Sequence, residues 1–384
     1  MRKIIVFISF CLFIFTMSGI GMAQDLDLEA ESAILIEAET GQLLYQKNIN
    51  KKVPPASITK IMTMLIAMEK VENEVLSLDD EIIISQYAES MGGSQIYLPA
   101  GVEVKLKDLL KAVAISSAND ASVAIAEAIS GSYSSFINLM NEKAEKLGMK
   151  NTHFMNSTGL PEANHYTTAR DISIMARELI KYKKVLEWTS IWVDYVKLPE
   201  REAMLANTNK LVNKFPGMDG LKTGHTDDAG FCLAATAKRD SVRLISVILG
   251  CNSQKERQEN TKRLLNYGFN FFEKKQMVNA AELIKNIKIP SGKKPVISGK
   301  PAQDLYVMLK RGSKTEPEVN IKIKEALKAP LKKGESIGQI IVTQNNRQLG
   351  LVDIITTEKI EKANIFIRLW REFVNWLGGW LQSF

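Results

Sequence analysis

A change of pattern near residue 276 divides the sequence into two parts that need different architectures. Segments of helical period alternate with short apolar strands before this point, whereas the later strands recur between turns rich in glycine, proline and lysine. The second part also holds 16 basic and 9 acidic residues, an excess equal to the +7 net charge of the chain. Because 384 residues can build more than one core, we expect an α/β (α+β) domain over 24–275 and a smaller all-β, sandwich-like domain over 276–362.

Several segments carry the signatures of individual elements. Residues 33–37 and 43–45 flank Thr40-Gly41-Gln42 as in a β-hairpin, and residues 231–237 and 244–249 form a second strand pair. Helices between early and late strands predict an antiparallel sheet flanked by helices. Periodicity predicts the helices from Ser57 onward and over 106–130, 134–147, 168–184 and 257–272. In the second part, strands are expected at 283–289, 319–324 and 340–342.

The first 23 residues have the pattern of a secretory signal peptide. Arg2 and Lys3 provide a positive start, an apolar run follows over 4–17, and small residues precede a cleavage point after Ala23. A retained membrane anchor is the alternative. Removal of 1–23 predicts an exported protein, so we expect an anionic wall or membrane surface, and no nucleic acid, beside the basic second part.

Removal of this segment leaves two cysteines, Cys232 and Cys251, both within apolar strand-like runs. An exported protein can join such residues in a disulfide, but we favour two buried free thiols. The sequence has no cysteine–histidine spacing typical of zinc. We therefore expect neither a metal nor a cofactor.

A serine and a lysine lie three residues apart at the start of an apolar helix. Ser57-Ile58-Thr59-Lys60 directly follows Pro54-Pro55-Ala56, and residues i and i+3 of a helix share a face. Serine needs a neighbouring base to act as a nucleophile, and lysine is such a base when burial and a second positive charge lower its pKa. Ser57 and Lys60 are therefore candidate catalytic residues. A second match, Ser291-Gly292-Lys293-Lys294, lies in a turn and is attributed to chance.

Two further short motifs contain groups that suit the same chemistry. In Ser117-Ala118-Asn119 the hydroxyl can relay a proton and the amide can hold a substrate carbonyl. In Lys222-Thr223-Gly224 the lysine and the threonine can bind a carboxylate, and the glycine lets a backbone approach an edge strand. Taken alone, Ser117-Ala118-Asn119 is better explained by loop polarity or by a helix cap.

The three motifs together resemble a known set. Serine-x-x-lysine, serine-x-asparagine and lysine-threonine-glycine occur in this order in the penicillin-recognising serine enzymes. Over essentially its whole length the sequence is similar to the low-molecular-weight D-Ala-D-Ala carboxypeptidases. The similarity extends to Asn156–Leu160, Asn207–Lys210, Asp219–His225 and Ala235–Arg239. The resemblance implies a β-lactamase/DD-peptidase-like catalytic domain that trims peptidoglycan stem peptides and binds β-lactam antibiotics.

The resemblance also implies a role for each residue in the acyl transfer. Ser57 attacks the carbonyl between the two terminal D-alanines, Lys60 takes its proton, and Ser117 relays a proton toward the leaving amine. Water then releases the acyl-enzyme. The resemblance also assigns residues that bind the substrate, namely Asn119, Lys222, Thr223, Gly224, His225 and Arg257. Of these, Asn119 orients the amide, Lys222 and Thr223 bind the terminal carboxylate together with Arg257, and the backbone N–H groups of Ser57 and His225 form the oxyanion hole.

Other functions remain open at this point. The motif residue Ala118 replaces the aspartate of the β-lactamase form, and no Glu-x-x-x-Asn lies between Asp120 and Lys222. Both departures disfavour a class A-like β-lactamase, so we expect the penicilloyl enzyme to persist. An esterase that uses the same dyad is a further alternative. A non-catalytic penicillin-binding scaffold would not need both lysines.

The last segment, 363–384, is expected to form an amphipathic helix. At 100° per residue its large apolar side chains fall within an arc of about 140°, opposite the charged residues. Three of the five tryptophans of the chain lie on this face, and indole favours the membrane–water interface. We expect the helix to lie in the outer face of the cytoplasmic membrane, with packing on the β domain as the alternative. The apolar face comprises Phe366, Leu369, Trp370, Phe373, Trp376, Leu377, Trp380, Leu381 and Phe384.

Overall fold

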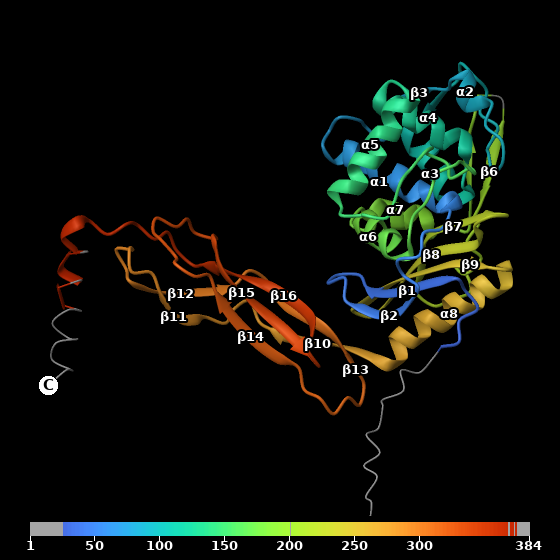
Figure 1. Ribbon diagram of the computed structural model, residues 1–384. Coiled ribbons are helices and arrows are strands. Elements are labelled where there is room, and N and C mark those ends of the chain that lie inside the picture. Colours follow the sequence, from blue (N-terminus) through green and yellow to red (C-terminus); the bar gives the residue numbers. More distant parts are fainter. Residues whose placement is uncertain (1–25, 200, 368, 372, 375–384) are drawn as a thin grey trace, which may run out of the picture.

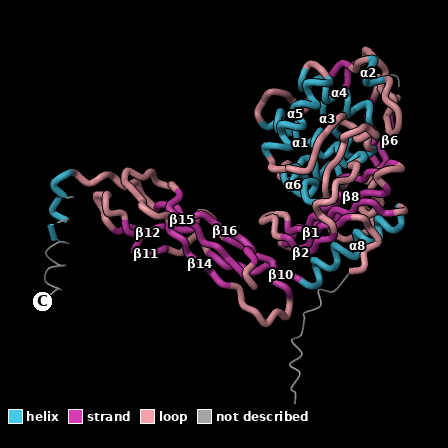
Figure 2. The backbone as a smooth tube through the Cα atoms, viewed as in Figure 1, coloured by secondary structure: helices cyan, strands magenta, loops and turns pink. Residues whose placement is uncertain are grey.

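The computed structural model describes residues 26–199, 201–367, 369–371 and 373–374. Figure 1 shows two parts, a mixed α/β domain and an elongated β domain that begins where helix α8 ends. Figure 2 shows that helices cover the first domain, whereas the second is built of strands until the helical tail. The expected signal peptide over 1–23 and residues 375–384 of the expected terminal helix lie outside the described residues.

A five-stranded antiparallel sheet forms the centre of the first domain, in the order β2-β1-β9-β8-β7. Both expected strand pairs belong to it, because β1 pairs with β2 and β8 pairs with β9. The sheet ends at β7, which is an edge strand. Its strands are β1 (Ser32–Glu37), β2 (Leu43–Lys47), β7 (Met218–Thr226), β8 (Gly230–Arg239) and β9 (Val242–Cys251). Two small pairs lie outside this sheet, β3 (Glu81–Ile83) with β4 (Glu103–Lys105) and β5 (Val193–Lys197) with β6 (Glu202–Ala206).

Helices cover both faces of the sheet, as the expected layered fold requires (Figure 1). Side chains alternate along β1, so Ile34 and Ile36 pack against the helical layer that contains α1, while Ala33 and Leu35 pack toward α8. Ser132, Thr168 and Ser253 cap α5, α6 and α8 through their side chains. The helices are α1 (Lys60–Glu72), α2 (Gln86–Glu89), α3 (Leu106–Ser116), α4 (Asn119–Ser130), α5 (Tyr133–Lys146), α6 (Ala169–Leu179), α7 (Lys183–Thr189) and α8 (Gln254–Phe271).

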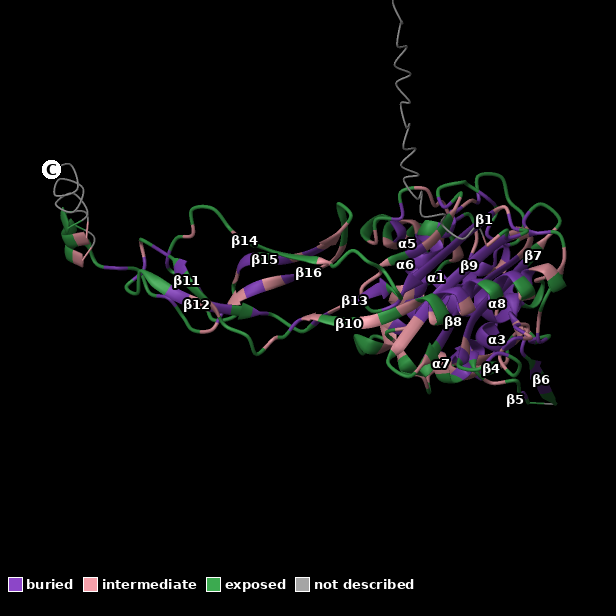
Figure 3. Ribbon diagram, turned by 90° about the horizontal axis from the view of Figure 1, so that it is seen from below, coloured by how far each residue is buried: buried purple, intermediate pink, exposed green. Residues whose placement is uncertain are grey.

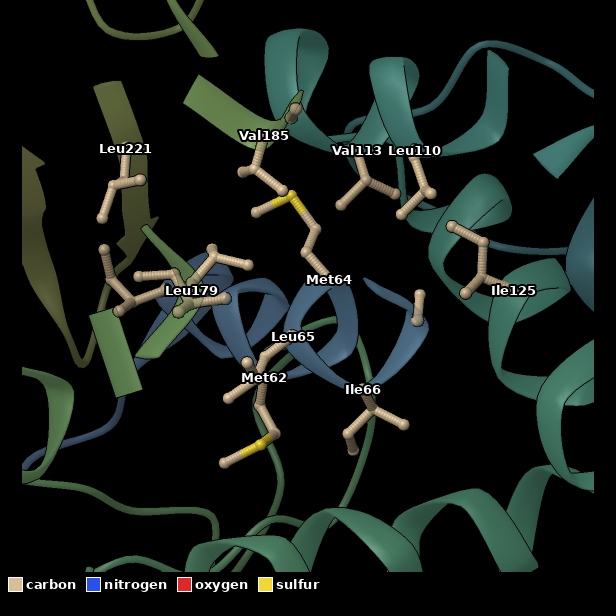
Figure 4. Packing of buried hydrophobic residues seen from close by; sticks show 14 of the residues in the cluster. Met62, Met64, Leu65, Ile66, Leu110, Val113, Ile125, Leu179, Val185 and Leu221 are labelled. Carbon is tan, nitrogen blue, oxygen red and sulfur yellow. The ribbon is translucent and has the colours of Figure 1, made fainter. Parts of the chain in front are cut away.

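Helix α1 lies at the centre of the helical layer. Every residue from Lys60 to Met68 is buried, which agrees with a helix that is apolar on nearly all sides. Figure 4 shows Met62, Leu65 and Ile66 pointing in different directions from α1, which lies among the surrounding helices and strands. Figure 3 shows the same concentration of buried residues in the first domain. The start of α1 is therefore held rigidly, and it carries the first motif.

The expected helix over 106–130 is two helices in the structure. Helix α3 ends at Ser116, Ser117 adopts the left-handed conformation with φ of 65°, and α4 begins at Asn119. The periodicity missed the break because no glycine or proline marks it. A left-handed serine is uncommon, and this one turns the second motif toward the start of α1.

The second domain has two sheets around its own core. A five-stranded sheet in the order β11-β12-β16-β15-β14 lies against the pair β10–β13, with Val307, Ile337, Val342 and Ile354 among the buried residues between them. All three expected strands are present, as β11, β14 and β15. The strands are β10 (Phe272–Val278), β11 (Ile284–Lys288), β12 (Val296–Pro301), β13 (Leu305–Lys310), β14 (Glu318–Ile323), β15 (Ser336–Gln344) and β16 (Arg347–Thr356).

The two domains join without a linker. Strand β10 starts at Phe272, directly after α8, and pairs with β13, so strand pairing in the second domain begins four residues before 276. The polar run Glu273-Lys274-Lys275-Gln276 gave no apolar alternation by which to detect this strand. The Gln42 side chain fixes the junction, since Nε2 donates to the Met308 carbonyl and Oε1 accepts from the Met308 N–H, both at 2.7 Å.

Two features of the sequence can be placed on this fold. Cys232 and Cys251 are buried free thiols, as we favoured. Residues 365–367, 369–371 and 373–374 are helical, and six of their apolar side chains are exposed. Within the described part of the chain, no helix combines the length and the apolar character needed to cross a membrane.

Candidate active site

The candidate nucleophile lies on a short turn that leads into the central helix. Ser57 is the second residue of the 3₁₀ turn η1 (Ala56–Thr59), and α1 follows directly. Side chains three residues apart eclipse each other on such a turn. The structure therefore brings the two side chains of the first motif together, with 3.0 Å between Lys60 Nζ and Ser57 Oγ.

The amine of Lys60 is enclosed by acceptors. The side chain is fully buried, and Nζ lies 2.6 Å from Asn119 Oδ1 and 2.7 Å from the Thr158 carbonyl oxygen. These two oxygens accept N–H groups and cannot donate. A neutral amine has two N–H groups and one lone pair, so its lone pair is left for the hydroxyl proton of Ser57. This arrangement suits proton abstraction from the serine.

The surroundings of Lys60 favour that neutral form. Burial lowers the pKa of Lys60 well below its ordinary value, and the nearby charge of Lys222 lowers it further. The charge of Asp120 acts in the opposite direction and raises it. Loss of hydration is therefore the main cause of the shift, and the second lysine is a smaller one.

The second motif lies between α3 and α4. Ser117 is buried at the end of α3, and Asn119 is the first residue of α4. The Asn119 amide is held from both sides, because Nδ2 donates to the Gly92 carbonyl at 2.6 Å while Oδ1 accepts from Lys60. The carbonyl of Gly92 thus determines which end of the amide faces the lysine.

The third motif lies on the edge strand β7. Lys222 is fully buried, and burial, with the charge of Arg257 as a second cause, lowers the pKa of Lys222 to about 7. The neighbouring Thr223 hydroxyl donates to Thr208 Oγ1 at 2.7 Å. An ammonium and a hydroxyl on one edge strand form a site that fits a carboxylate.

Gly224 brings β7 against the nucleophile turn. A Cβ atom at this position would lie 3.0 Å from the Pro55 carbonyl oxygen, 3.1 Å from Ala56 Cβ and 3.2 Å from Ile58 Cγ1. We expected the glycine to admit a substrate backbone. The structure adds a second reason, since the strand must approach the residues around Ser57 closely.

The side chain of His225 points away from this chemistry. Its ring stacks on Phe231 with 3.9 Å between centroids, and Nδ1 lies 3.3 Å from the Gly230 carbonyl oxygen. Its backbone, however, continues β7 directly beyond Gly224, at the level of the nucleophile turn. Any contribution of His225 to this site therefore comes from its backbone.

Arg257 extends from α8 to the same region. It is buried, its Nη1 donates to the Cys232 carbonyl at 3.4 Å, and its Nε has no hydrogen-bond partner among the described residues. Its charge acts on Lys222. Buried guanidinium groups are normally saturated with hydrogen bonds, so the unpartnered and buried Nε is an exception.

Sequence reasoning missed four groups that shape the site. The carbonyl groups of Thr158 and Gly92, the hydroxyl of Thr208 and the carboxylate of Asp120 all act on motif residues. Thr158 and Thr208 do lie in segments that carried the family resemblance. No sequence signal could identify the two carbonyl groups. The position of a backbone oxygen depends on the path of its loop and not on the residue type.

Comparison with known proteins finds a matching family model for each domain. Residues 20–253 match the family model described as D-alanyl-D-alanine carboxypeptidase, and residues 272–362 match the one described as penicillin-binding protein 5, C-terminal domain. The chain is similar to the D-alanyl-D-alanine carboxypeptidase DacF of Bacillus subtilis, with 39% identity over 91% of this chain and 90% of that protein. It is 31% identical to DacC of Escherichia coli, over 97% of this chain and 96% of the relative.

A solved structure extends the similarity to three dimensions. The crystal structure of penicillin binding protein 5 from Haemophilus influenzae superimposes with a TM-score of 0.78 and 28% identity, over 87% of this chain and 98% of that one. The arrangement of an α/β catalytic domain followed by a β domain is common to both. This chain belongs to the D-alanyl-D-alanine carboxypeptidase family, the family that its three motifs resemble.

Proposed function

We propose that the chain is a serine-type D-alanyl-D-alanine carboxypeptidase that removes the terminal D-alanine from peptidoglycan stem peptides through an acyl-enzyme on Ser57. In the first step Ser57 Oγ bonds to the carbonyl carbon between the two D-alanines, and its proton passes to Lys60 Nζ. The 3.0 Å contact between these atoms and the two acceptors that fix the amine support this step.

Collapse of the tetrahedral intermediate breaks the peptide bond and requires a proton on the leaving amine. Lys60 holds that proton, and Ser117, beside Asn119, relays it to the nitrogen of the departing D-alanine. The N–H groups of Ser57 and His225 stabilise the oxyanion. Support for this role of His225 comes from Gly224, which allows β7 to approach the turn of Ser57 closely. Water then attacks the ester and restores Ser57.

The terminal carboxylate of the substrate binds to Lys222, Thr223 and Arg257, while Asn119 orients the amide. The buried ammonium, the adjacent hydroxyl and the free Nε of Arg257 support this assignment. Gly224 keeps the strand close to the nucleophile. A β-lactam carries a carboxylate beside its reactive carbonyl, so β-lactam antibiotics bind in the same position and acylate Ser57.

One observation carries the proposal: the fully buried Lys60 has two acceptors for its N–H groups and directs its third position to Ser57. The test is incubation with diacetyl-lysyl-D-Ala-D-Ala and measurement of free D-alanine. The full chain should release D-alanine, and Ser57→Ala should not. Release by Ser57→Ala, or none by the full chain, would contradict the proposal.

We further propose that the protein is exported and that its terminal helix tethers it to the outer face of the cytoplasmic membrane. The exposure of Phe366, Leu369 and Trp370 supports this, since large apolar side chains left in water favour burial in a membrane interface. The contact that the helix makes with the β domain is polar, because the Arg371 guanidinium donates to the Gly292 carbonyl at 2.8 Å and to the Lys293 carbonyl at 2.9 Å.

A shortened chain that ends at Ala363 tests the tether. It should stay folded, act normally on small peptides and remain in the supernatant when lipid vesicles are pelleted, while the full chain sediments. Sedimentation of the shortened chain, or its unfolding, would show that the helix belongs to the fold.

A further inference from the structure

A loop that carries none of the three motifs forms one wall of the site. Residues 92–98 run between α2 and β4 without regular structure. The Gly92 carbonyl accepts from Asn119 Nδ2 at 2.6 Å, and the Ser94 carbonyl accepts from the Asn119 N–H at 2.7 Å. The loop therefore holds Asn119, whose other amide end contacts Lys60.

Asp120 fixes this loop from the inside. Its carboxylate is fully buried and accepts the N–H groups of Ile96 at 3.0 Å, Leu98 at 3.1 Å and Ala121 at 2.9 Å. All three partners are donors, which is the set that an ionised carboxylate takes. Ile96 and Leu98 are buried on either side of the exposed Tyr97, so these bonds hold the loop at two points.

Arg201, next to the start of β6, holds the same stretch from the outside. Its guanidinium donates to the Ile96 carbonyl and, at 2.9 Å, to the Tyr97 carbonyl. The loop is thus clamped between a buried anion on α4 and a surface cation beside a hairpin. Gly93 shows how tightly the loop is placed, because a Cβ atom there would lie 2.9 Å from Asn119 Nδ2.

We propose that Asp120 is a positioning residue for the reaction described above, on which this inference rests: its buried carboxylate fixes loop 92–98 and thereby the Asn119 amide against Lys60. A substitution that removes the carboxylate frees the loop at Ile96 and Leu98. The carbonyl groups of Gly92 and Ser94 then no longer hold Asn119 in one orientation.

The charge of Asp120 provides a second readout. The charged groups that act on Lys60 are Lys222 from β7 and Asp120 from α4, and they shift the pKa of Lys60 in opposite directions. Lys60 must be neutral to accept the serine proton, so acylation rises with pH through the pKa of Lys60. Removal of the Asp120 charge lowers that pKa and moves the acid limb of the profile to lower pH.

The test measures the second-order rate of acylation by a fluorescent penicillin as a function of pH, in the full chain and in three variants. Asp120→Asn should acylate about 10- to 100-fold more slowly, because small misplacements of a positioning group have effects of this size. Its acid limb should also lie at lower pH. Arg201→Ala should slow acylation to a smaller extent and leave the limb in place, since it loosens the loop without changing the charge near Lys60.

Asp171→Asn is the matched control. Asp171 is also a buried carboxylate, which accepts the Asn151 N–H at 2.9 Å and the Thr152 hydroxyl at 2.8 Å, away from the site. This control should acylate at the rate of the unaltered chain. A folded Asp120→Asn protein with an unchanged rate and limb would overturn the proposal, as would an equal loss in Asp171→Asn.

If Asp120→Asn does not fold, the Arg201→Ala variant provides the test. An unchanged acylation rate in that variant would overturn the proposal that loop 92–98 must be held in place. Absence of acylation in the unaltered chain would instead refute the proposed function itself, so the two failures are distinguishable.

Discussion

The two domains differ in whether they bury charged side chains. The catalytic domain buries two lysines, an arginine and an aspartate around one serine, namely Lys60, Lys222, Arg257 and Asp120. Over 272–362, which the structure describes in full, no lysine, arginine, aspartate or glutamate is buried, although that domain carries the excess of positive charge. A buried charge is costly unless it is paired or neutralised, so a cluster of them marks chemistry and not stability.

The same difference appears in the hydrogen bonds of the lysines. In the β domain, Lys294 reaches Glu358 at 2.8 Å with both side chains largely exposed. In the catalytic domain, Lys60 contacts an amide, a carbonyl and a hydroxyl but no carboxylate. The first arrangement is an exposed ion pair, and the second favours the neutral form of the lysine. The presence of a lysine therefore indicates little about function. Its burial and the type of its hydrogen-bond partners indicate much more.

The largest effect of a substitution is expected at Lys60. Lys60→Arg keeps the positive charge, but a guanidinium does not give up its proton near neutral pH. Loss of the base should reduce penicillin acylation about 10²- to 10⁴-fold, measured as the second-order rate with a labelled penicillin. Near-normal acylation would exclude Lys60 as the base. The same exchange at exposed Lys294 should leave the rate unchanged.

A smaller loss is expected when a valine is placed on the edge strand. In Gly224→Val the new side chain meets Pro55, Ala56 and Ile58, so β7 must move away from Ser57. A displacement of about 1 Å can reduce the rate on the order of 100-fold. Gly350→Val in the β domain is the control, because its Cβ atom would lie 3.0 Å from Leu305. It should lower the unfolding midpoint but not the acylation rate. Equal acylation by both variants would refute the steric role of Gly224.

The pH dependence of turnover should separate the two buried lysines. Lys222 binds the substrate carboxylate in its protonated form, and its pKa is lowered to about 7. The value of kcat/KM for a D-Ala-D-Ala peptide should therefore fall as the pH rises through about 7, while an amide-capped peptide shows no such fall. Arg257→Gln removes a charge that lowers this pKa and should move the fall to higher pH. If the fall in kcat/KM stays at the same pH in this variant, a group other than Lys222 titrates.

The smallest effect is expected for the surface pair. Lys294→Ala should change the free energy of unfolding by less than about 1 kcal/mol, because exposed ion pairs contribute little. Denaturant unfolding measures this, and kcat/KM should stay unchanged. A loss of several kcal/mol would mean that the β domain depends on its charges more than its exposed pairs indicate.

Much of the fold followed from local patterns. The hairpin of β1 and β2, the pair β8–β9 and the strands β11, β14 and β15 all lie where alternation and turn residues predicted them. The break at Ser117 and the polar strand β10 did not follow, because tertiary contacts impose the left-handed serine and the pairing of Phe272–Val278. The local sequence contains no signal for the left-handed serine or for this strand.

The candidate site can also be divided into features that the sequence predicted and features that it did not. The motifs identified Lys60, which contacts Ser57, and Asn119, which contacts Lys60, since residue type and spacing limit what these side chains can do. The path of loop 92–98 and the carbonyl of Thr158 remained unseen, because backbone groups have no sequence signature. Asp120 directly follows the second motif, but its burial and its three N–H partners become evident only in the folded chain.

The position of the penicillin adduct tests most directly whether Ser57 is the nucleophile. The full chain is treated with penicillin, digested and analysed by mass spectrometry. We predict a single penicilloyl group on the peptide that contains Ser57, and no labelling of Ser57→Ala. An adduct on another peptide, or full labelling of Ser57→Ala, would contradict the assignment of Ser57 as the nucleophile.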